Sequence, residues 1–324
     1  MADAPEIAVA VPSHDRPVRL RWLLNALEEQ TLDRSRFEIV IAHDSSGPET
    51  EELLRTHPLA TAGTLRHVSL PPGSAPPGRN RNAAWREARA PLLAFTDDDC
   101  RPPPEWLERA LEAARANAGT IVQGATRPDP AEDDIGRFAT HVTTRSIKPP
   151  AAQAQACNIV YPRSVLEAHG GFDETMYVGE DTDLAERARA AGVELVGAPE
   201  AITWHAVEEH SLLGMVRGSW RWGGLPELIR RHPRLRREFH LWAFYRREHV
   251  WLPLVVAAWL LGRRNRFALA LALPYVIQAA PRHRGTNLKG RLRAASELPG
   301  RFLIDGTEFL ALALGSIRHR TFFL

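Results

Sequence analysis

Cysteine is scarce in this chain of 324 residues, which contains only Cys100 and Cys157. Two cysteines so far apart in the sequence form neither a disulfide framework nor the paired spacing of a zinc site. Small domains that depend on disulfides belong to oxidising compartments, so a reducing cytosol is the simplest expectation. The scarcity therefore argues against the disulfide-rich secreted class and against cysteine-based zinc modules.

Long apolar runs are also missing. The runs Val250–Leu261 and Phe267–Ala280 are both shorter than the stretch of about 20 apolar residues that crosses a bilayer. The N-terminus has no basic leader followed by an apolar run, and Ile7–Val11 has the pattern of a core strand instead. We therefore expect a cytoplasmic protein without a signal peptide.

Charge is unevenly distributed, although the formal net charge is only +2. Residues 1–210 hold 21 Lys or Arg and 33 Asp or Glu, whereas residues 211–324 hold 20 and 6. The two apolar runs lie in this basic part, and the segment 263–266, Arg-Arg-Asn-Arg, separates them. Basic, apolar hairpins with tryptophan nearby are typical of segments that lie in a membrane interface. The alternative is a helical subdomain that packs against the core or a second subunit.

This basic region predicts a polyanionic partner. Nucleic acid would also match the charge, but paired apolar runs fit lipid better. We therefore expect an anionic membrane surface as the partner and no nucleic acid.

Strand and helix patterns alternate over the first 125 residues. The strand patterns are Ile7–Val11, Phe37–Ala42, Leu65–Leu70, Leu92–Thr96 and Thr120–Ala125, and the helix patterns lie near 17–30, 48–56, 78–90 and 104–118. This alternation predicts an α/β fold with a mostly parallel sheet flanked by helices. Residues 71–78 are expected to form a loop, and the polar, Pro-rich residues 128–155 a mobile loop over a site. Regular structure is expected to resume at Cys157–Tyr161, 164–169, 181–191 and Ala201–Trp204.

Three carboxylates, Asp97, Asp98 and Asp99, directly follow one of the predicted strands. Open α/β folds bind ligands at the carboxyl edge of the sheet, where these side chains would lie. Carboxylates this close repel one another unless a cation neutralises them, and hard oxygen ligands suit Mg²⁺ or Mn²⁺. The alternative is an acidic turn that precedes the next helix.

Polar segments follow two other predicted strands. Residues 12–16, Pro-Ser-His-Asp-Arg, follow the first strand, and residues 43–46, His-Asp-Ser-Ser, follow the second. A carboxylate such as Asp44 can accept a hydrogen bond from a base N–H or a ribose hydroxyl. Residues 78–82, Gly-Arg-Asn-Arg-Asn, open a helix, and both helix N-termini and arginines favour phosphate. Each segment alone is also compatible with an ordinary solvated turn.

Two further motifs come later in the chain. Glu180 and Asp181 follow a glycine and begin a helix, so they have the exposure and positioning that a general base needs. Helix capping is the alternative, and the two roles do not exclude each other. Trp204-His205 ends the last predicted strand. A lone histidine is often structural, but here an imidazole at the acidic edge suits a metal and favours Mn²⁺ over Mg²⁺.

In this order the motifs resemble the family 2 glycosyltransferases of the GT-A fold. The matching stretches are VAVPSHDRP, FEIVIAHDSS, PPGRNRNAAW, LLAFTDDDCRPPPEWL, GGFDE, GEDTDLAERARAAG and TWH. The resemblance covers residues 5–207 and becomes loose after about 225. His43 stands where the family often has another acidic residue, and Asn82 stands where a glycine is common.

The resemblance implies an inverting transferase that uses a nucleotide sugar and Mn²⁺ or Mg²⁺. By that analogy, Asp181 is the general base beside Glu180, and Asp99, Asp97 and His205 hold the metal. The residues implied in donor binding are Pro12, Arg16, Asp44, Arg79, Asp97 and Asp98. UDP- and dTDP-sugars both fit these motifs as donors. The basic, apolar C-terminal third, rather than the resemblance, suggests a glycan or a lipid-linked molecule of the cell envelope as the acceptor.

It also implies a domain organisation. A GT-A catalytic domain would span residues 1–210, with a nucleotide-sugar half at 1–125 and an acceptor half at 126–210. The charge asymmetry and the apolar runs, rather than the resemblance, predict that a helical, basic region at 211–324 follows and attaches the protein to the inner face of the cell membrane. One alternative is a sugar-phosphate nucleotidyltransferase, although residues 12–16 lack the glycine-rich phosphate loop of that class. The other is a non-catalytic membrane-docked module with the same fold.

Overall fold

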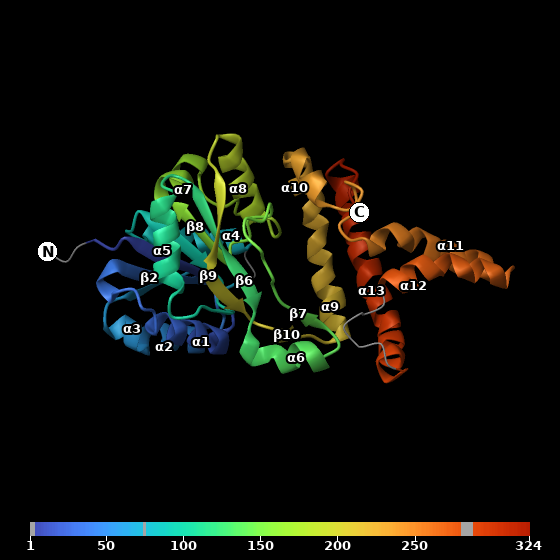
Figure 1. Ribbon diagram of the computed structural model, residues 1–324, viewed down its shortest axis with the longest axis horizontal. Helices are drawn as coiled ribbons and strands as arrows, with labels where there is room; N and C mark the ends of the chain where they lie inside the picture. The colour runs from blue at the N-terminus through green and yellow to red at the C-terminus, as the bar shows by residue number, and fades with distance from the viewer. Residues whose placement is uncertain (1–3, 74–75, 280–287) are drawn as a thin grey trace. The chain divides into compact units, whose positions relative to one another are not determined.

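The computed structural model describes residues 4–73, 76–279 and 288–324. The chain forms two compact units, Met1–Glu208 and Glu209–Leu324. The N-terminal unit contains an eight-stranded sheet with the order β3-β2-β1-β4-β8-β6-β9-β5 (Figure 1). Its strands are β1 Ile7–Ser13, β2 Phe37–His43, β3 Leu65–Ser69, β4 Leu92–Thr96, β5 Cys100–Arg101, β6 Ile121–Pro128, β8 Asn158–Pro162 and β9 Leu195–His205.

The sheet is mostly parallel. Strands β3, β2, β1 and β4 run parallel to one another, and β6 runs parallel to β9. Strand β8 is antiparallel to both β4 and β6, and β5 is antiparallel to β9. The predicted α/β fold with a mostly parallel sheet and flanking helices is therefore confirmed.

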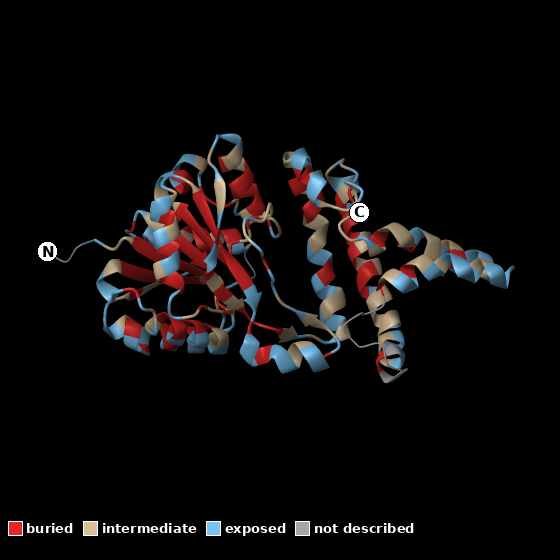
Figure 2. Ribbon diagram, viewed as in Figure 1, coloured by how far each residue is buried: buried red, intermediate tan, exposed pale blue. Residues whose placement is uncertain are grey.

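Helices cover both faces of the sheet, which explains the continuous apolar runs of its strands. In β1, Ile7, Val9 and Val11 belong to one core and Ala8 and Ala10 to another. Figure 2 shows that the central strands of the sheet are mostly buried. Side chains of α1 and α5 contribute to the first core, and side chains of α4, α7 and α8 contribute to the second. The helices of this unit are α1 Pro17–Glu28, α2 Pro48–Thr56, α3 Pro58–Thr61, α4 Pro77–Glu87, α5 Trp106–Ala116, α6 Asp133–Phe138, α7 Arg163–His169 and α8 Glu180–Ala190, with 3₁₀ turns η1 Arg34–Arg36 and η2 Pro130–Glu132.

Strand direction brings the polar segments to one edge. Because β1, β2 and β4 are parallel neighbours, the residues that follow each of them emerge at the same edge of the sheet. These are residues 14–16, 44–47 and 97–99.

Several elements differ from the predicted ones. Strand β9 begins at Leu195 rather than near Ala201, and the two-residue strands β5 and β7 Val142–Thr143 were not predicted. Strand β5 is defined by its pairing with β9, and a two-residue segment carries no periodic signal of its own. Residues 128–155, predicted as a loop, include η2, α6 and β7. Residues 74–75 of the predicted loop 71–78 lie outside the described residues.

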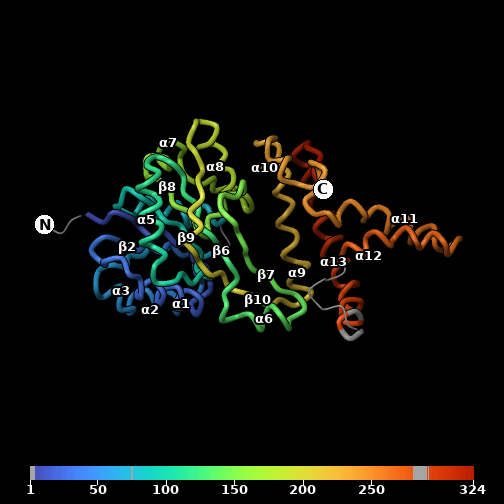
Figure 3. Tube along the Cα trace, in the orientation of Figure 1, coloured from blue at the N-terminus to red at the C-terminus, as the bar shows by residue number. Residues whose placement is uncertain are grey.

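The C-terminal unit is helical (Figure 3). After β10 Glu208–Glu209, its elements are α9 Leu212–Ser219, η3 Trp220–Gly224, α10 Leu225–Arg231, η4 Pro233–Glu238, η5 Glu248–Trp251, α11 Leu252–Gly262, η6 Arg266–Ala272, α12 Leu273–Ala279 and α13 Leu288–Arg318. The second predicted apolar run ends at residue 280, which lies outside the described residues. Among the helices described, none combines the length and the apolar character that crossing a membrane requires.

Candidate active site at the edge of the sheet

The aspartates after β4 are Asp97, Asp98 and Asp99. Their side chains have different hydrogen-bond partners because the three residues lie in a tight turn. The backbone N–H of Cys100 donates to the carbonyl of Asp97 at 3.1 Å and closes this turn. Asp98 accepts hydrogen bonds from Ser13 Oγ at 2.8 Å and from the backbone N–H of His14 at 3.3 Å. It is only 6% exposed, so its carboxylate faces the loop after β1 rather than solvent.

Asp99 lies opposite His205. The antiparallel pairing of β5 with β9 places Cys100 beside His205, and the backbone N–H of Ala206 donates to the carbonyl of Asp99 at 2.9 Å. These contacts bring His205 Nε2 to 3.6 Å from Asp99 Oδ1. His205 Nδ1 is 3.0 Å from the carbonyl oxygen of Ala206. Because a carbonyl only accepts, we assign a proton to Nδ1, and Nε2 is the ring nitrogen that faces Asp99.

The residues present fit a divalent cation. Within the described part of the chain, Asp97, Asp99 and His205 each offer a ligand atom, and these atoms lie within 4.8 Å of one another. Asp99 Oδ1 is buried and has no hydrogen-bond partner among the described residues. Two carboxylates and one imidazole suit Mg²⁺ or Mn²⁺, and the imidazole favours Mn²⁺.

Arg16 also reaches this cluster. Its Nη1 donates to Asp99 Oδ2 at 2.7 Å, and its Nη2 lies 3.4 Å from Glu208 Oε2. The family resemblance implied a role for Arg16 in donor binding, and the structure places this side chain beside the acidic turn. An arginine here provides positive charge next to the carboxylates, where a phosphate group would also be attracted.

Arg81 connects the acidic turn to the start of α8. Its Nη2 donates to Asp97 Oδ1 at 2.8 Å, and its Nη1 donates to Glu180 Oε1 at 2.5 Å. Sequence reasoning selected Arg79 for the donor pocket and missed Arg81. A spacing of two residues puts the two side chains on different faces of α4, and no local pattern shows which face meets the acidic residues. Arg79 is half-buried, whereas Arg81 is buried.

Glu180 and Asp181 have different surroundings. Glu180 is buried and paired with Arg81. Asp181 is half-buried, and its two carboxylate oxygens accept from the backbone N–H groups of Thr182 at 2.7 Å and Ala156 at 3.2 Å. These two N–H groups fix the orientation of the Asp181 carboxylate.

Asp44 lies at the end of β2 and is only 1% exposed. Its Oδ1 accepts from Asn80 Nδ2 at 2.9 Å and lies 3.0 Å from His14 Nδ1. The structure therefore brings the loop after β1, the end of β2 and the start of α4 together around Asp44. Pro12, also expected here, is half-buried near the end of β1.

Asn82 holds the turn that contains the GGFDE motif. Its Nδ2 donates to the carbonyl of Phe172 at 2.8 Å, and its Oδ1 accepts from the backbone N–H of Phe172 at 2.9 Å and from Trp85 Nε1 at 2.9 Å. Gly171 has φ +73°, and a Cβ there would lie 2.4 Å from Asn82 Oδ1. The asparagine at a position where a glycine is common thus has a structural role in this chain.

The acidic groups differ in their affinity for protons. Burial, followed by the charge of Asp99, raises the pKa of Asp98 to about 7. Burial and the charge of Asp181 raise the pKa of Glu180 to about 7, although Arg81 opposes this change. Burial also raises the pKa of Asp181 above its usual value. In Asp97 burial acts in the same direction, but the charge of Arg81 holds the net pKa below its usual value.

Comparison with known proteins gives a consistent result. The model of the family described as Glycosyl transferase family 2 matches residues 8–170, about half of the chain. Glycosyltransferase AglE of Haloferax volcanii is 26% identical over 206 residues, which cover 62% of this chain and 67% of that protein. The pre-mycofactocin glycosyltransferase of Mycobacterium tuberculosis is 28% identical over 245 residues, which cover 70% of this chain but only 48% of that protein.

Solved structures show the same fold. The mannosyltransferase PcManGT from Pyrobaculum calidifontis, in complex with GDP-Man and Mn²⁺, aligns with a TM-score of 0.58 and 18% identity over 98% of this chain and 88% of that chain. S. aureus TarS 1–349, in complex with UDP-GlcNAc, aligns with a TM-score of 0.53 and 14% identity over 98% of this chain and 92% of that chain. At these identities the similarity shows the fold alone. The family match and the named relatives favour the glycosyltransferase over both the nucleotidyltransferase and the non-catalytic alternative, and we conclude that the chain belongs to glycosyl transferase family 2 and is a glycosyltransferase.

Proposed function

We propose that this protein transfers a sugar from a nucleoside diphosphate sugar to an acceptor hydroxyl, with inversion at the anomeric carbon. The observation that carries this proposal is the convergence of Asp97, Asp99 and His205, whose ligand atoms lie within 4.8 Å of one another. They lie at the edge where β1 and β2 also end, which is where open α/β sheets bind nucleotides.

The donor would lie along this edge. Pro12, Asp44 and Arg79 would line the nucleoside pocket. Arg16, which donates a hydrogen bond to Asp99 in the structure, would face the diphosphate of the donor. Asp98 is turned toward Ser13 and His14, so we assign it to positioning the loop that holds the donor. UDP- and dTDP-sugars are the first candidates, and GDP-sugars join them because a structural neighbour holds GDP-Man.

Asp181 would act as the general base. An alcohol is a poor nucleophile at neutral pH, so a carboxylate that takes its proton during attack accelerates transfer. The two backbone N–H groups that hold Asp181 would keep it oriented for this step, and Glu180 would hold Arg81 rather than touch the acceptor. Attack on the face opposite the leaving diphosphate would invert the anomeric centre. A bound Mn²⁺ or Mg²⁺ would supply Lewis-acid stabilisation for the charge on that leaving group.

Water would have to be kept away from the donor. Residues 128–155 or Met176–Gly179 would close over the bound donor and limit its hydrolysis. We assign a glycan or a lipid-linked molecule of the cell envelope as acceptor. Such an acceptor would place the enzyme at the inner face of the cell membrane as a peripheral protein.

Thermal unfolding of the purified chain with nucleoside diphosphates and their sugars, with and without Mn²⁺, tests the donor site. A ligand that binds only the folded state raises the melting temperature by mass action. We expect a Mn²⁺-dependent increase with one nucleoside, lost in Asp99→Asn and retained in Glu112→Gln. Glu112 is a matched control because its carboxylate is exposed on α5, where it pairs with Arg109 at 3.0 Å.

The same protein is then supplied with acceptors, and the anomeric configuration of any product is read by NMR. A product with the configuration opposite to that of the donor supports inversion, and a product with retained configuration contradicts it. If the melting temperature of the folded protein does not change with any nucleotide, the assignment of the donor site is wrong.

A further inference from the structure

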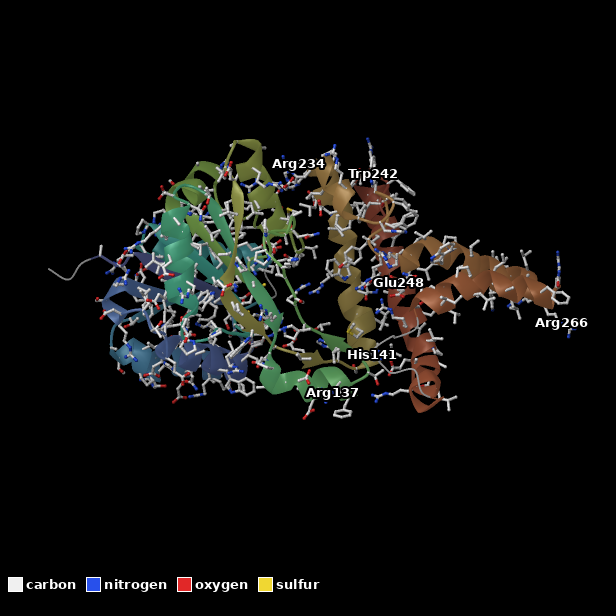
Figure 4. All side chains as sticks on the ribbon, in the orientation of Figure 1. Arg137, His141, Arg234, Trp242, Glu248 and Arg266 are labelled. Carbon is white, nitrogen blue, oxygen red and sulfur yellow. The ribbon has the colours of Figure 1, made fainter. Side chains whose placement is uncertain are left out.

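The segment Leu252–Ala279 forms a helical hairpin in the C-terminal unit, which we call the α11–α12 hairpin. Helix α11 packs against η6, which continues directly into α12. The two arms lie side by side in Figure 3, and Arg266 marks the end of the hairpin in Figure 4.

The two ends of the hairpin have different environments. At the base, Leu252, Tyr275 and Ala279 are buried in a core that also includes Phe302 and Phe309 of α13. The ring of Tyr275 contacts that of Phe302 edge-on, and its hydroxyl donates to Asp305 Oδ2 at 3.1 Å. The base is therefore anchored to α13.

The outer part of the hairpin exposes large apolar side chains. The exposed fraction is 76% for Phe267 and 67% for Ile277. Others that are at least half exposed are Val256, Trp259, Leu260, Leu261, Leu269 and Leu273. So many exposed apolar side chains on one short segment mark an interaction surface.

The tip is a defined turn rather than a loose loop. A Cβ on Gly262 would lie 2.6 Å from Leu269 Cδ2, so the glycine permits the close approach of the two arms. The side chain of Asn265 accepts from the backbone N–H of Phe267 at 3.0 Å and caps η6. This turn holds the neighbouring residues in fixed positions.

Charge at the tip has a single sign. Arg263, Arg264 and Arg266 are all exposed, and residues 252–279 contain no aspartate or glutamate. Arg263 Cζ lies 4.0 Å from the centroid of the Trp259 ring, and Arg266 Cζ lies 5.6 Å from the centroid of the Phe267 ring. Cations stacked on exposed aromatic rings are suited to the region where lipid headgroups meet acyl chains.

We propose that the α11–α12 hairpin is a membrane-binding element that lies in the interface of an anionic bilayer. Its exposed apolar side chains would enter the boundary of the acyl chains, and the three arginines would bind anionic headgroups. Each arm is too short to cross the bilayer, so the element lies in one leaflet. This binding does not depend on the sugar-transfer chemistry, so the two proposals can fail separately.

Sedimentation of the full chain with vesicles tests this inference. We expect binding to phosphatidylcholine vesicles that contain phosphatidylglycerol, weaker binding to phosphatidylcholine alone, and a further decrease at high salt. The triple variant Arg263→Gln/Arg264→Gln/Arg266→Gln should bind anionic vesicles roughly 100-fold more weakly, about fivefold for each arginine. The variant Phe267→Ser/Ile277→Ser should lose binding to both kinds of vesicle.

A matched triple variant separates local charge from net charge. Arg21, Arg55 and Arg89 are exposed on the N-terminal unit, so changing all three to glutamine alters the net charge equally. This variant should bind anionic vesicles nearly as well as the parent chain. If both triples lose binding equally, binding reflects net charge alone and the hairpin assignment is wrong.

A depth probe adds a second measurement. Because Cys100 and Cys157 are buried, a cysteine introduced as Leu269→Cys can be labelled selectively with an environment-sensitive dye. Quenching of this dye by lipids brominated in the acyl chain supports insertion, and the same dye at Arg109→Cys on α5 should not be quenched. If the chain ignores anionic vesicles and instead forms a dimer that Phe267→Ser/Ile277→Ser dissociates, a second copy covers the hairpin and the proposal fails.

Discussion

His205 and Asp99 lie opposite each other at the end of β9, with 3.6 Å between Nε2 and Oδ1. The backbone fixes this relationship, because β5 pairs with β9 beside both residues and Ala206 donates to the carbonyl of Asp99. Side chains held by a sheet are more precisely placed than side chains held by loops alone.

The first prediction concerns His205. Replacing it by asparagine removes the imidazole from the cluster, so Mn²⁺ binding should weaken by at least about tenfold while Mg²⁺ binding changes less. Isothermal titration with each metal measures this. His319→Asn in the C-terminal unit is the control, and equal losses for the two metals would contradict an imidazole ligand.

The second prediction concerns Asp181. Asp181→Asn should abolish transfer and leave Mn²⁺-dependent nucleotide binding intact, since the amide cannot accept the proton of the acceptor. Because burial raises the pKa of Asp181, the rate of the parent chain should fall with decreasing pH earlier than for an ordinary aspartate. Steady-state rates across pH measure this fall, and full activity in Asp181→Asn would exclude it as the base.

The third prediction concerns Asp98 in metal-free protein. Its folded pKa of about 7 lies above its unfolded value of about 4, so the folded state binds more protons between these two values. The stability that protonation provides is fully present below about pH 4 and is lost as pH rises toward 7. Asp98→Asn cannot lose a proton, so its unfolding free energy relative to the parent should rise over this window by at most about 4 kcal/mol.

Urea unfolding at a series of pH values measures this difference. Asp133→Asn should run parallel to the parent chain throughout the window, since its carboxylate is exposed. A constant difference between Asp98→Asn and the parent would show that Asp98 has an ordinary pKa.

The fourth prediction concerns Asn82. Asn82→Gly removes the hydrogen bonds to Phe172 and Trp85 and should lower the unfolding free energy by about 2 kcal/mol or more. Ala83→Gly, the next residue of α4, controls for the cost of a glycine in a helix, which is about 1 kcal/mol. If urea unfolding shows the same loss of unfolding free energy in both variants, the hydrogen bonds of Asn82 do not stabilise the fold.

The sequence alone predicts the order of the helices and strands. It also predicts which edge of the sheet carries the candidate site. Apolar runs that alternate with helical periods predict a mostly parallel sheet. Polar residues at the ends of Ile7–Ser13 and Leu92–Thr96 then lie together because parallel strands end at one edge. The family motifs added roles for Asp97, Asp99 and Asp181, which remain proposals.

Only the tertiary structure showed which neighbours each polar side chain meets. Arg81 rather than Arg79 contacts Asp97 and Glu180, and Asp98 turns toward Ser13. The difference arises from rotation around a helix axis and from the direction of a three-residue turn, which depend on packing against strands that are distant in the sequence. The composition of residues 211–324 predicted a region that binds a membrane surface. Tertiary packing determines which of its apolar side chains are buried against α13 and which remain exposed.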